Sequence, residues 1–205
     1  MVMVMDLKEA AAIADVSAKV IRHCLEAEVI APTRTEGHWR FTLEDALFFA
    51  LRDALPFAID LEDQRALYDL VVGRKKRSTS GWKLIDPDTL ELGKNQLRMS
   101  VDFSLIRRDL TRRLALLAKR EERIVSSPET LGGTPVFVGT RVSVAHVGAL
   151  MLRGVPMAQM KEDFPRLKEE DFELAHLLAR IGPPPGRPRR LPPIRLVRAP
   201  HRRAG

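Results

Sequence analysis

The last 23 residues of this 205-residue chain, 183–205, cannot join a regular folded core. They hold seven of the 14 prolines and seven arginines, and they hold no acidic residue. Proline lacks the amide hydrogen that helices and central strands need, and a segment with few large apolar groups cannot offset the entropy lost on folding. The folded part must therefore be built from residues 1–182, with an extended tail behind it.

The tail also carries the entire net charge. The chain has 34 Lys and Arg against 27 Asp and Glu, a formal charge of +7, so removing the seven tail arginines leaves 27 groups of each sign. A strip of this kind suits an acidic partner. Apolar side chains lie among the arginines and are spaced like anchors for pockets on such a partner: Leu191, Ile194, Leu196 and Val197.

Length and composition limit the classes of protein to which this chain can belong. A chain of this length forms one or two domains. The single cysteine, Cys24, excludes an internal disulfide and indicates a reducing cytoplasm. No apolar run approaches the ~20 residues of a membrane span, and the apolar start, Met1–Met5, lacks the features of a signal peptide. We expect a cytoplasmic protein with no membrane partner.

Residues 1–72 have the pattern of a winged helix-turn-helix. Apolar spacing predicts a helix over 7–13 and a second helix to about Glu28, with Ser17 as its N-cap. Glu36-Gly37 marks a turn that is typical of a wing, with strand-like alternation after it. Residues 42–45 then resemble a capping box before a helix over 46–55.

This order of elements resembles the DNA-binding unit of MerR-type transcription regulators. The resemblance rests on the second helix and its exit (VSAKVIRHCLEAEVIAP), the wing (GHWRF) and the next helix (TLEDALFFALRDAL). In that family the second helix enters the major groove, and the wing touches the DNA backbone or the minor groove. The resemblance implies operator DNA as a partner, contacted by Ser17, Lys19, Arg22 and His23 on the helix and by Arg34, His38 and Arg40 on the wing.

Simpler interpretations remain open for these residues. Lys19 and Arg22 also fit an ordinary solvated helix face, and Trp39 fits a core position under the wing. Residues 1–72 contain seven basic and 13 acidic residues. That excess of negative charge argues against strong binding by a monomer, because affinity for DNA rests on phosphate neutralisation, and a dimer would double the local positive charge.

Residues 73–123 are basic, with 14 positive and seven negative side chains. The run Arg74–Arg77 and the following 78–81 read as a linker that is either solvated or in contact with phosphate. Short strands are predicted at residues 82–85, 90–92 and 97–101, with turns at 86–88 and at Gly93.

Asp102 then caps a predicted amphipathic helix. Its apolar face comprises Phe103, Ile106, Leu110, Leu114 and Leu117, and its basic face comprises Arg107, Arg108, Arg112, Arg113, Lys119 and Arg120. We expect a connector packed on a domain. A subunit interface or a contact with the DNA backbone is the alternative.

Residues 124–182 predict a strand pair followed by three short helices, arranged like a helix-turn-helix. Residues 136–138 and 142–144 are strand-like and are joined at Gly139. Ser143 can cap a helix that ends at Gly154, Pro156 suits the first turn of the next helix, and 168–181 predicts the last one. The strand pair leaves an open edge, through which we expect a homodimer.

The same segment is similar to the domain-of-unknown-function family numbered 433. The matching features are Gly132-Gly133-Thr134-Pro135, Gly139-Thr140-Arg141-Val142, the helix ending at Gly154, Phe164-Pro165-Arg166-Leu167, and a final helix with Ala175 and Ala179. Proteins of that family are often antitoxins of type II toxin–antitoxin modules (VapB-like), whose partners are commonly PIN-type ribonucleases. The resemblance implies an antitoxin that represses its own operon and covers a toxin with its tail.

The tail has a physical role in such a complex. A PIN-type nuclease holds Mg²⁺ with clustered carboxylates, and a planar guanidinium can pair with them and exclude the metal. Proline keeps the backbone extended and lowers the entropy lost on docking. The candidate toxin-binding residues are Arg187, Arg189, Arg190, Leu191, Ile194, Arg195, Leu196 and Arg198, and Arg195 is the preferred one for the toxin's active site.

Other motifs receive structural interpretations. Gly132-Gly133 predicts a turn, since no Gly-Lys-Ser follows. Arg141 is expected to form a structural salt bridge in or near the strand through which the chain is expected to dimerise. His146 and His176 lack a second ligand at a metal-like spacing, so no metal or cofactor is expected. The sequence shows no nucleophile–base pair that would indicate an enzyme. It also shows no cysteine cluster or aromatic cage that would indicate a small-molecule site. The open alternatives are a stand-alone MerR-like regulator without a toxin and a basic tail that binds DNA or nothing.

The expected fold is thus mainly α with short β elements, in four parts. They are a winged helix-turn-helix (1–72), a basic linker with short strands and a connecting helix (73–123), a dimerising C-terminal domain (124–182) and an extended toxin-binding tail (183–205).

Overall fold

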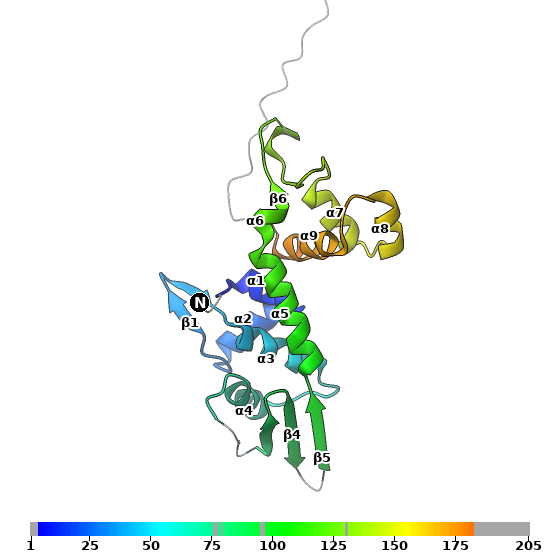
Figure 1. Cartoon of the computed structure of the whole chain (residues 1–205). Helices are drawn as coiled ribbons and strands as arrows, with labels where there is room; N and C mark the ends of the chain where they lie inside the picture. The colour runs from blue at the N-terminus through cyan, green and yellow to red at the C-terminus, as the bar shows by residue number, and fades with distance from the viewer. Residues whose placement is uncertain (1–3, 76–77, 79, 95–96, 130, 183–205) are drawn as a thin grey trace, which may run out of the picture.

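The computed structural model describes residues 4–182, except 76–77, 79, 95–96 and 130. This part is mainly helical with short antiparallel sheets, as the sequence predicts. The long helix α5 (Ser104–Ala118) runs along the middle of an elongated arrangement, with a three-stranded sheet at one end and the C-terminal helices at the other (Figure 1). None of the described helices is both long and apolar enough to cross a membrane.

Two short helices lie at the N-terminus, where the sequence predicts a helix-turn-helix. α1 (Leu7–Ala14) begins with a capping box between Asp6 and Glu9 and ends at Asp15, which takes the left-handed conformation (φ 59°). α2 (Ala18–Glu26) follows after two residues. It ends short of the expected Glu28, because Glu28 itself has a positive φ of 52°. Ser17 occupies the N-cap position but makes no side-chain capping bond.

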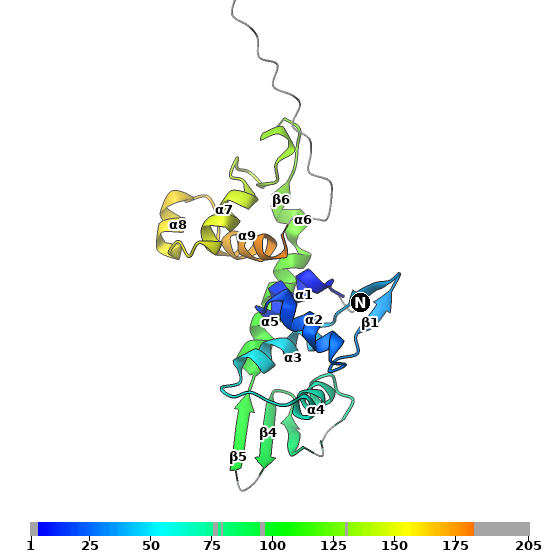
Figure 2. The same ribbon diagram turned by 180° about the vertical axis from the view of Figure 1, so that it is seen from behind.

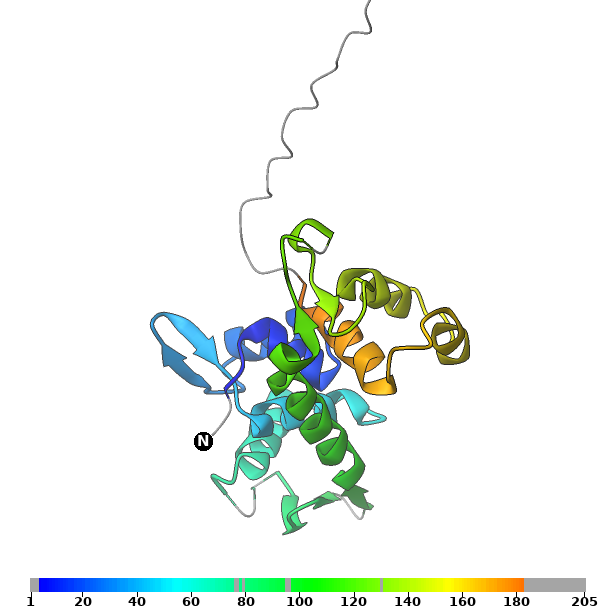
Figure 3. The same ribbon diagram turned by 45° about the horizontal axis from the view of Figure 1, so that its top comes forward.

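The predicted wing is a hairpin of β1 (Thr33–Thr35) and β2 (His38–Arg40). Its two turn residues both have positive φ, 51° for Glu36 and 80° for Gly37, as a tight two-residue hairpin requires. Its base is anchored by an antiparallel bridge between Met5 and Phe41, with N···O distances of 2.8 and 2.9 Å. The hairpin therefore projects from the body on a fixed base, as Figures 1 and 2 show from opposite sides and Figure 3 in a tilted view.

Helices α3 (Leu43–Ala54) and α4 (Leu61–Val71) pack behind the wing. α3 carries the predicted capping box, in which Thr42 Oγ1 accepts from the backbone N–H of Asp45. No element was predicted at α4, although Asp60 caps it by accepting the N–H of Asp63 at 2.8 Å. Phe41, Phe48, Phe49 and Tyr68 contact one another edge to face in the core between them.

The middle sheet contains the three predicted strands in the order β3 (Trp82–Asp86), β4 (Thr89–Lys94) and β5 (Leu97–Asp102). The turn at 86–88 is confirmed. The predicted turn at Gly93 is wrong, because β4 continues through it and pairs Lys94 with Leu97. Gly93 instead lies against Gly81, whose added Cβ would stand 2.4 Å from the Gly93 carbonyl oxygen.

α5 packs against helices of both the N-terminal and the C-terminal segments, as a connector would. Asp102 accepts the N–H of Ser104 at 2.8 Å, and the helix contacts α1, α3 and α9 (Glu169–Ile181). Four arginines of its basic face and of the short α6 (Arg120–Arg123) pair with acidic groups of the same chain: Arg107 with Asp88, Arg112 with Glu173, Arg113 with Asp15 and Arg120 with Glu9. These side chains stabilise the fold.

The first of the two strands predicted in the C-terminal domain forms, but it pairs with a strand that was not predicted. β7 (Val136–Phe137) pairs with β6 (Ile124–Val125) and not with residues 142–144. The Phe137 carbonyl accepts the Thr140 N–H, and Phe137 N–H donates to Val142 O, so the chain turns tightly after β7. Only an isolated bridge, Val136 to Ser143, remains of the predicted pairing, because α7 starts immediately afterwards.

Three helices complete this unit: α7 (Val144–Leu152), α8 (Met157–Asp163) and α9. Ser143 caps α7 and Gly154 follows its end with φ 76°, both as predicted, while Pro156 takes the N-cap of α8. Phe172, Val147 and Met160 are fully buried in the core between them. Gly148 allows α7 to approach α9 closely, since a Cβ there would lie 2.6 Å from Ala175 O.

Replacing Gly148 with alanine should destabilise the protein by about 1–3 kcal/mol, because the added methyl group meets backbone that has no space to move. The matched control is Gly93→Ala, whose Cβ meets nothing within 4 Å. Urea unfolding followed by circular dichroism measures both. Equal midpoints for the two variants would contradict the close approach of the helices.

Candidate nucleic-acid interface

The four predicted contact residues of α2 lie on the solvent side of the helix. Ser17, Lys19, Arg22 and His23 are all exposed, whereas the opposite face is fully buried at Ile21 and Cys24. Lys19, Arg22 and His23 share one face through their i, i+3 and i+4 spacing. The structure thus brings them together on an accessible surface, and their contact with DNA stays a prediction.

The wing presents its predicted residues less uniformly. Arg34 and His38 are exposed and Arg40 is half-buried. The Arg34 guanidinium is held over the Trp39 ring at 5.2 Å from its centroid, and its Nε donates to Gly37 O at 3.1 Å. This cation–π contact keeps a flat, positively charged surface on the hairpin.

The expectation that Trp39 fills the core is wrong. Trp39 is 37% exposed, and Phe41 occupies the fully buried position two residues later. Both side chains lie on the same face of the strand, but the hairpin extends beyond the body, so the face that is covered at Phe41 is open at Trp39. An exposed indole beside arginine is a candidate base or sugar contact that the sequence analysis missed.

Two arginines of the α4 region hold the segment between α2 and the wing. Arg65 donates through Nη2 to Ala27 O at 2.8 Å and through Nε to Glu28 O at 3.2 Å. Arg74 Nη2 donates to Ala31 O at 3.2 Å. Cations at the carbonyl end of a helix satisfy groups that the helix leaves unpaired. The orientation of the wing relative to α2 therefore depends on α4.

A buried carboxylate supports the base of the wing from below. Asp45 accepts the Thr42 N–H at 2.7 Å through Oδ2 and the Tyr68 hydroxyl at 2.7 Å through Oδ1. Burial, together with the hydrogen bond to Asp45, raises the pKa of Tyr68 far above its ordinary range. Tyr68 therefore stays protonated and keeps donating, which joins the start of α3 to α4.

Charges of both signs surround the candidate surface. From α2 to the wing it carries Lys19, Arg22, Arg34 and Arg40 against Glu26, Glu28 and Glu36, so four positive groups less three negative ones leave +1. Affinity for DNA grows with the number of phosphates neutralised. One copy of this surface therefore offers little electrostatic attraction beyond what close contacts supply.

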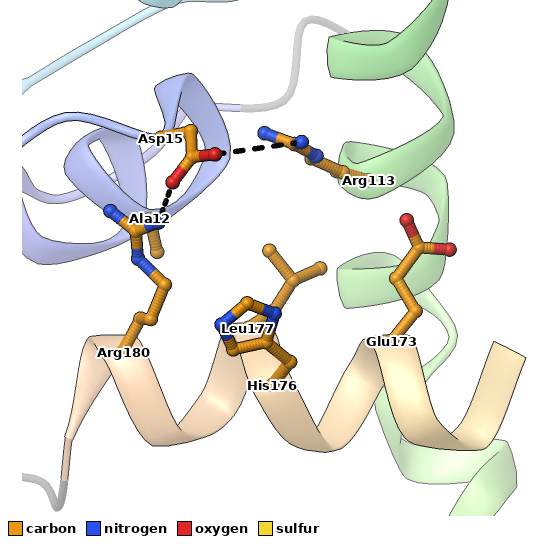
Figure 4. Close-up of a pocket in the computed structure, with 7 residues that line it drawn as sticks. All are labelled: Ala12, Asp15, Arg113, Glu173, His176, Leu177 and Arg180. Atoms are coloured by element: carbon orange, nitrogen blue, oxygen red, sulfur yellow. Dashed lines mark ion pairs between the residues drawn. The ribbon is translucent and has the colours of Figure 1, made fainter. Parts of the chain in front are cut away.

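A second cluster joins the helix-turn-helix to the C-terminal helices. Asp15, in the turn after α1, pairs with Arg113 of α5 at 3.9 Å and with Arg180 of α9 (Figure 4). The same arginines donate to backbone carbonyls near the turn, Arg113 to Ile13 O at 2.9 Å and Arg180 to Val16 O at 3.3 Å. His176 and Glu173 border the small hollow, of about 60 Å³, between these helices.

Comparison with known proteins assigns the C-terminal unit. Residues 124–177 match the protein family described as "Protein of unknown function (DUF433)". This segment is a DUF433 domain. A stretch of 91 residues, 44% of the chain, is 40% identical to "Uncharacterized protein y4eO" of Sinorhizobium fredii (strain NBRC 101917 / NGR234). The matched stretch spans 41% of that relative's length. No solved structure matches the chain.

The DUF433 domain starts at β6 and ends within α9. Arg123, just before β6, donates to Asp171 Oδ1 at 2.6 Å and pairs with Glu170, which ties the start of the domain to its last helix. Arg180 lies three residues beyond the matched range and reaches the helix-turn-helix. The DUF433 domain is therefore attached to the candidate DNA-binding unit through α9.

The predictions for other residues of the DUF433 domain are confirmed only in part. Gly132 and Gly133 lie in the single 3-10 turn η1 (Leu131–Gly133), with φ of 63° and 85°, where a turn is predicted. Arg141 is exposed and has no ion-pair partner among the residues that the structure describes, so the predicted salt bridge is absent there. His146 contacts the Phe164 ring, and His176 lines the hollow beside Arg180. The candidate toxin-binding residues, Arg187–Arg198, lie outside the described part of the chain.

Replacing Tyr68 with phenylalanine should lower the free energy of unfolding by about 1–3 kcal/mol, because the buried Asp45 Oδ1 loses its donor. Chemical denaturation measures the loss. The control is the same substitution in an Asp45→Ala background, where Tyr68→Phe should cost little. An equal loss in both backgrounds would show that the hydroxyl does not act through Asp45.

Proposed function

We propose that this protein is a DNA-binding antitoxin of a type II toxin–antitoxin module. Residues 1–72 bind operator DNA and repress the chain's own operon, and residues 183–205 neutralise a PIN-type ribonuclease. The observation that carries the DNA-binding part is the joint exposure of Lys19, Arg22 and His23 on α2 beside an exposed basic hairpin. The DUF433 match and the composition of the tail support the toxin-binding part.

The shape of the N-terminal unit suits a DNA duplex. An α-helix of about 10–12 Å diameter fits the major groove of B-DNA, which is about 12 Å wide. α2 presents a long cation and a guanidinium from its outer face, which are the side chains that pair with guanine edges and phosphates. The hairpin, with Arg34 stacked on Trp39, would then lie along the backbone or in the adjacent minor groove.

The composition of the tail supports an acidic partner. Residues 183–205 begin immediately after α9 and Gly182, so the DUF433 domain presents them from its last helix. Seven arginines without an acidic residue can pair with the carboxylates that hold Mg²⁺ in a nuclease, and apolar residues between them add burial. Fully extended, the tail reaches roughly 75 Å at ~3.3 Å per residue, enough to cross one face of a small nuclease.

Charge reversal on α2 tests the DNA-binding part. Arg22→Glu should weaken binding to the DNA upstream of the gene by about tenfold or more and should lower the dependence of log K on log salt, because a phosphate or base contact is lost. Fluorescence anisotropy across a KCl series measures both quantities. The matched control is Arg108→Glu, an exposed position on α5 with no ion pair in the described residues. Identical affinities for the two variants would exclude α2 as the reading helix.

Removal of the tail tests the toxin-binding part. A Met1–Gly182 variant should keep full affinity for the upstream DNA and lose the capacity to inhibit the nuclease encoded beside it, because the arginines that reach the active site are gone. Co-purification with the tagged neighbouring protein and an RNA-cleavage assay measure this. Inhibition by the truncated chain would refute a role for the tail. A chain that binds DNA but captures no nuclease would be a stand-alone MerR-like regulator.

A further inference from the structure

We propose that the outer edge of β5 pairs with the same strand of a second copy of this chain and forms a two-fold symmetric antiparallel dimer. β5 is bonded to β4 on one side, and within the described residues no strand covers its other side. Figures 1 and 2 show β5 at the outer edge of the sheet from front and back. The register between β4 and β5 is regular over all six residues, so this edge is straight enough to accept a partner.

The hydrogen-bond pattern identifies the backbone groups at this edge. The Gly93 N–H donates to Gly81 O at 3.1 Å, so the polar groups of Gly93 face β3. Arg98 is the partner of Gly93 in β5, and in an antiparallel ladder the polar groups of such a pair point away from each other. The groups of Arg98 therefore face outward, and those of Ser100 and Asp102 follow with the two-residue period of a strand.

The side chains at these outward positions complement one another when the strand meets its own copy. A two-fold axis at Ser100 pairs Ser100 with itself and places each Arg98 opposite Asp102 of the other copy. It joins all three outward residues of both chains through about six backbone hydrogen bonds. An axis at Arg98 or at Asp102 would instead oppose like charges, which is unfavourable in a cross-strand pair. The edge is thus self-complementary in one register.

The surroundings of the two charged residues fit this pairing. Arg98 and Asp102 are both exposed. Arg98 interacts electrostatically with Glu91 of β4 and helps to lower the pKa of that carboxyl, but it makes no ion pair within 4 Å in the described residues. Hydrogen bonds from Ser104 hold the pKa of Asp102 below its ordinary value, so the carboxylate stays charged. On the opposite face of the sheet, Met99 and Val101 are partly buried against the core. The same axis places Met99 of each copy next to Val101 of the other copy. The dimer would extend the apolar layer as well as the sheet.

This interface differs from the edge of β6 and β7, through which the sequence analysis expected a homodimer. It does not depend on the proposed function, because it uses no residue of α2, the wing or the tail. The dimer would, however, carry two copies of the candidate surface on α2 and the wing, and so eight positive groups in place of four. More phosphates could then be neutralised than by a single copy.

A charge-swap experiment on the full-length chain tests the dimer. Arg98→Asp opposes two carboxylates at each end of the interface, and Asp102→Arg opposes two guanidinium groups, so each variant alone should be monomeric. Mixed together, the two variants restore an opposite pair at both ends and should form a heterodimer. Size-exclusion chromatography with light scattering at matched micromolar concentrations gives the masses, and wild type should have the mass of a dimer.

Two controls separate the interface from folding and from net charge. Arg108→Asp changes the same charge at an exposed position on α5 and should remain dimeric. Asp102 also accepts the Ser104 N–H at the start of α5, so circular dichroism checks the fold of Asp102→Arg. Ser100→Pro offers a second disruption, which removes an outward N–H without touching the ladder to β4. A monomeric wild type, a dimeric Arg98→Asp variant, or folded variants that fail to associate when mixed would each overturn the proposal.

Discussion

The joint between the N-terminal unit and the DUF433 domain depends on three helices that meet at the turn after α1. Asp15 attracts an arginine from α5 and another from α9, but its side chain is 56% exposed, so the ion pairs themselves contribute at most about 1 kcal/mol. The bonds from the same arginines to the carbonyls of Ile13, in the last turn of α1, and Val16, in the turn after it, add more, because these carbonyls have no partner within a helix. Leu177 of α9 completes the joint, since it is buried in the core of the N-terminal unit.

Several arginines of the described residues serve the fold and not a partner. Arg107, Arg112 and Arg113 of α5 and Arg120 of α6 pair with acidic groups on other elements. Arg65 and Arg74 bind the carbonyls that follow α2. The structure makes these arginines part of its framework. Exposed cations without an ion pair in the described residues include Arg22 of α2, Arg34 of the hairpin and Arg98 of β5. Net charge alone would not have separated the two groups.

Local signals predicted most elements from the sequence. Capping residues before α3 and α7, the turn at Glu36-Gly37 and the glycine after α7 all act within a few neighbours, and the structure places each where it was expected. The failures involve contacts between distant residues. β6 has two residues and no periodicity, so its pairing with β7 could not be read from the pattern. Trp39 was misplaced because its exposure depends on how far the hairpin extends beyond the body.

The same distinction applies to the candidate site. Helical spacing predicted the exposed face of α2, since it follows from the burial of the other face. The contacts of Arg65 and Arg74 with the segment after α2 could not be foreseen, because they need the position of a helix that the sequence analysis had not assigned. The helix was nevertheless signalled by Asp60 and the acidic residues after it, a capping pattern like the one that marked α3.

The single thiol of the chain, Cys24, can report when α2 separates from the core of the N-terminal unit. Cys24 is fully buried on the inner face of α2, and burial raises its pKa, which disfavours the reactive thiolate. An alkylating reagent can therefore reach it only when α2 separates from the core. Because the chain has no second cysteine, the rate of labelling reports the opening of this one helix, without a probe having to be introduced.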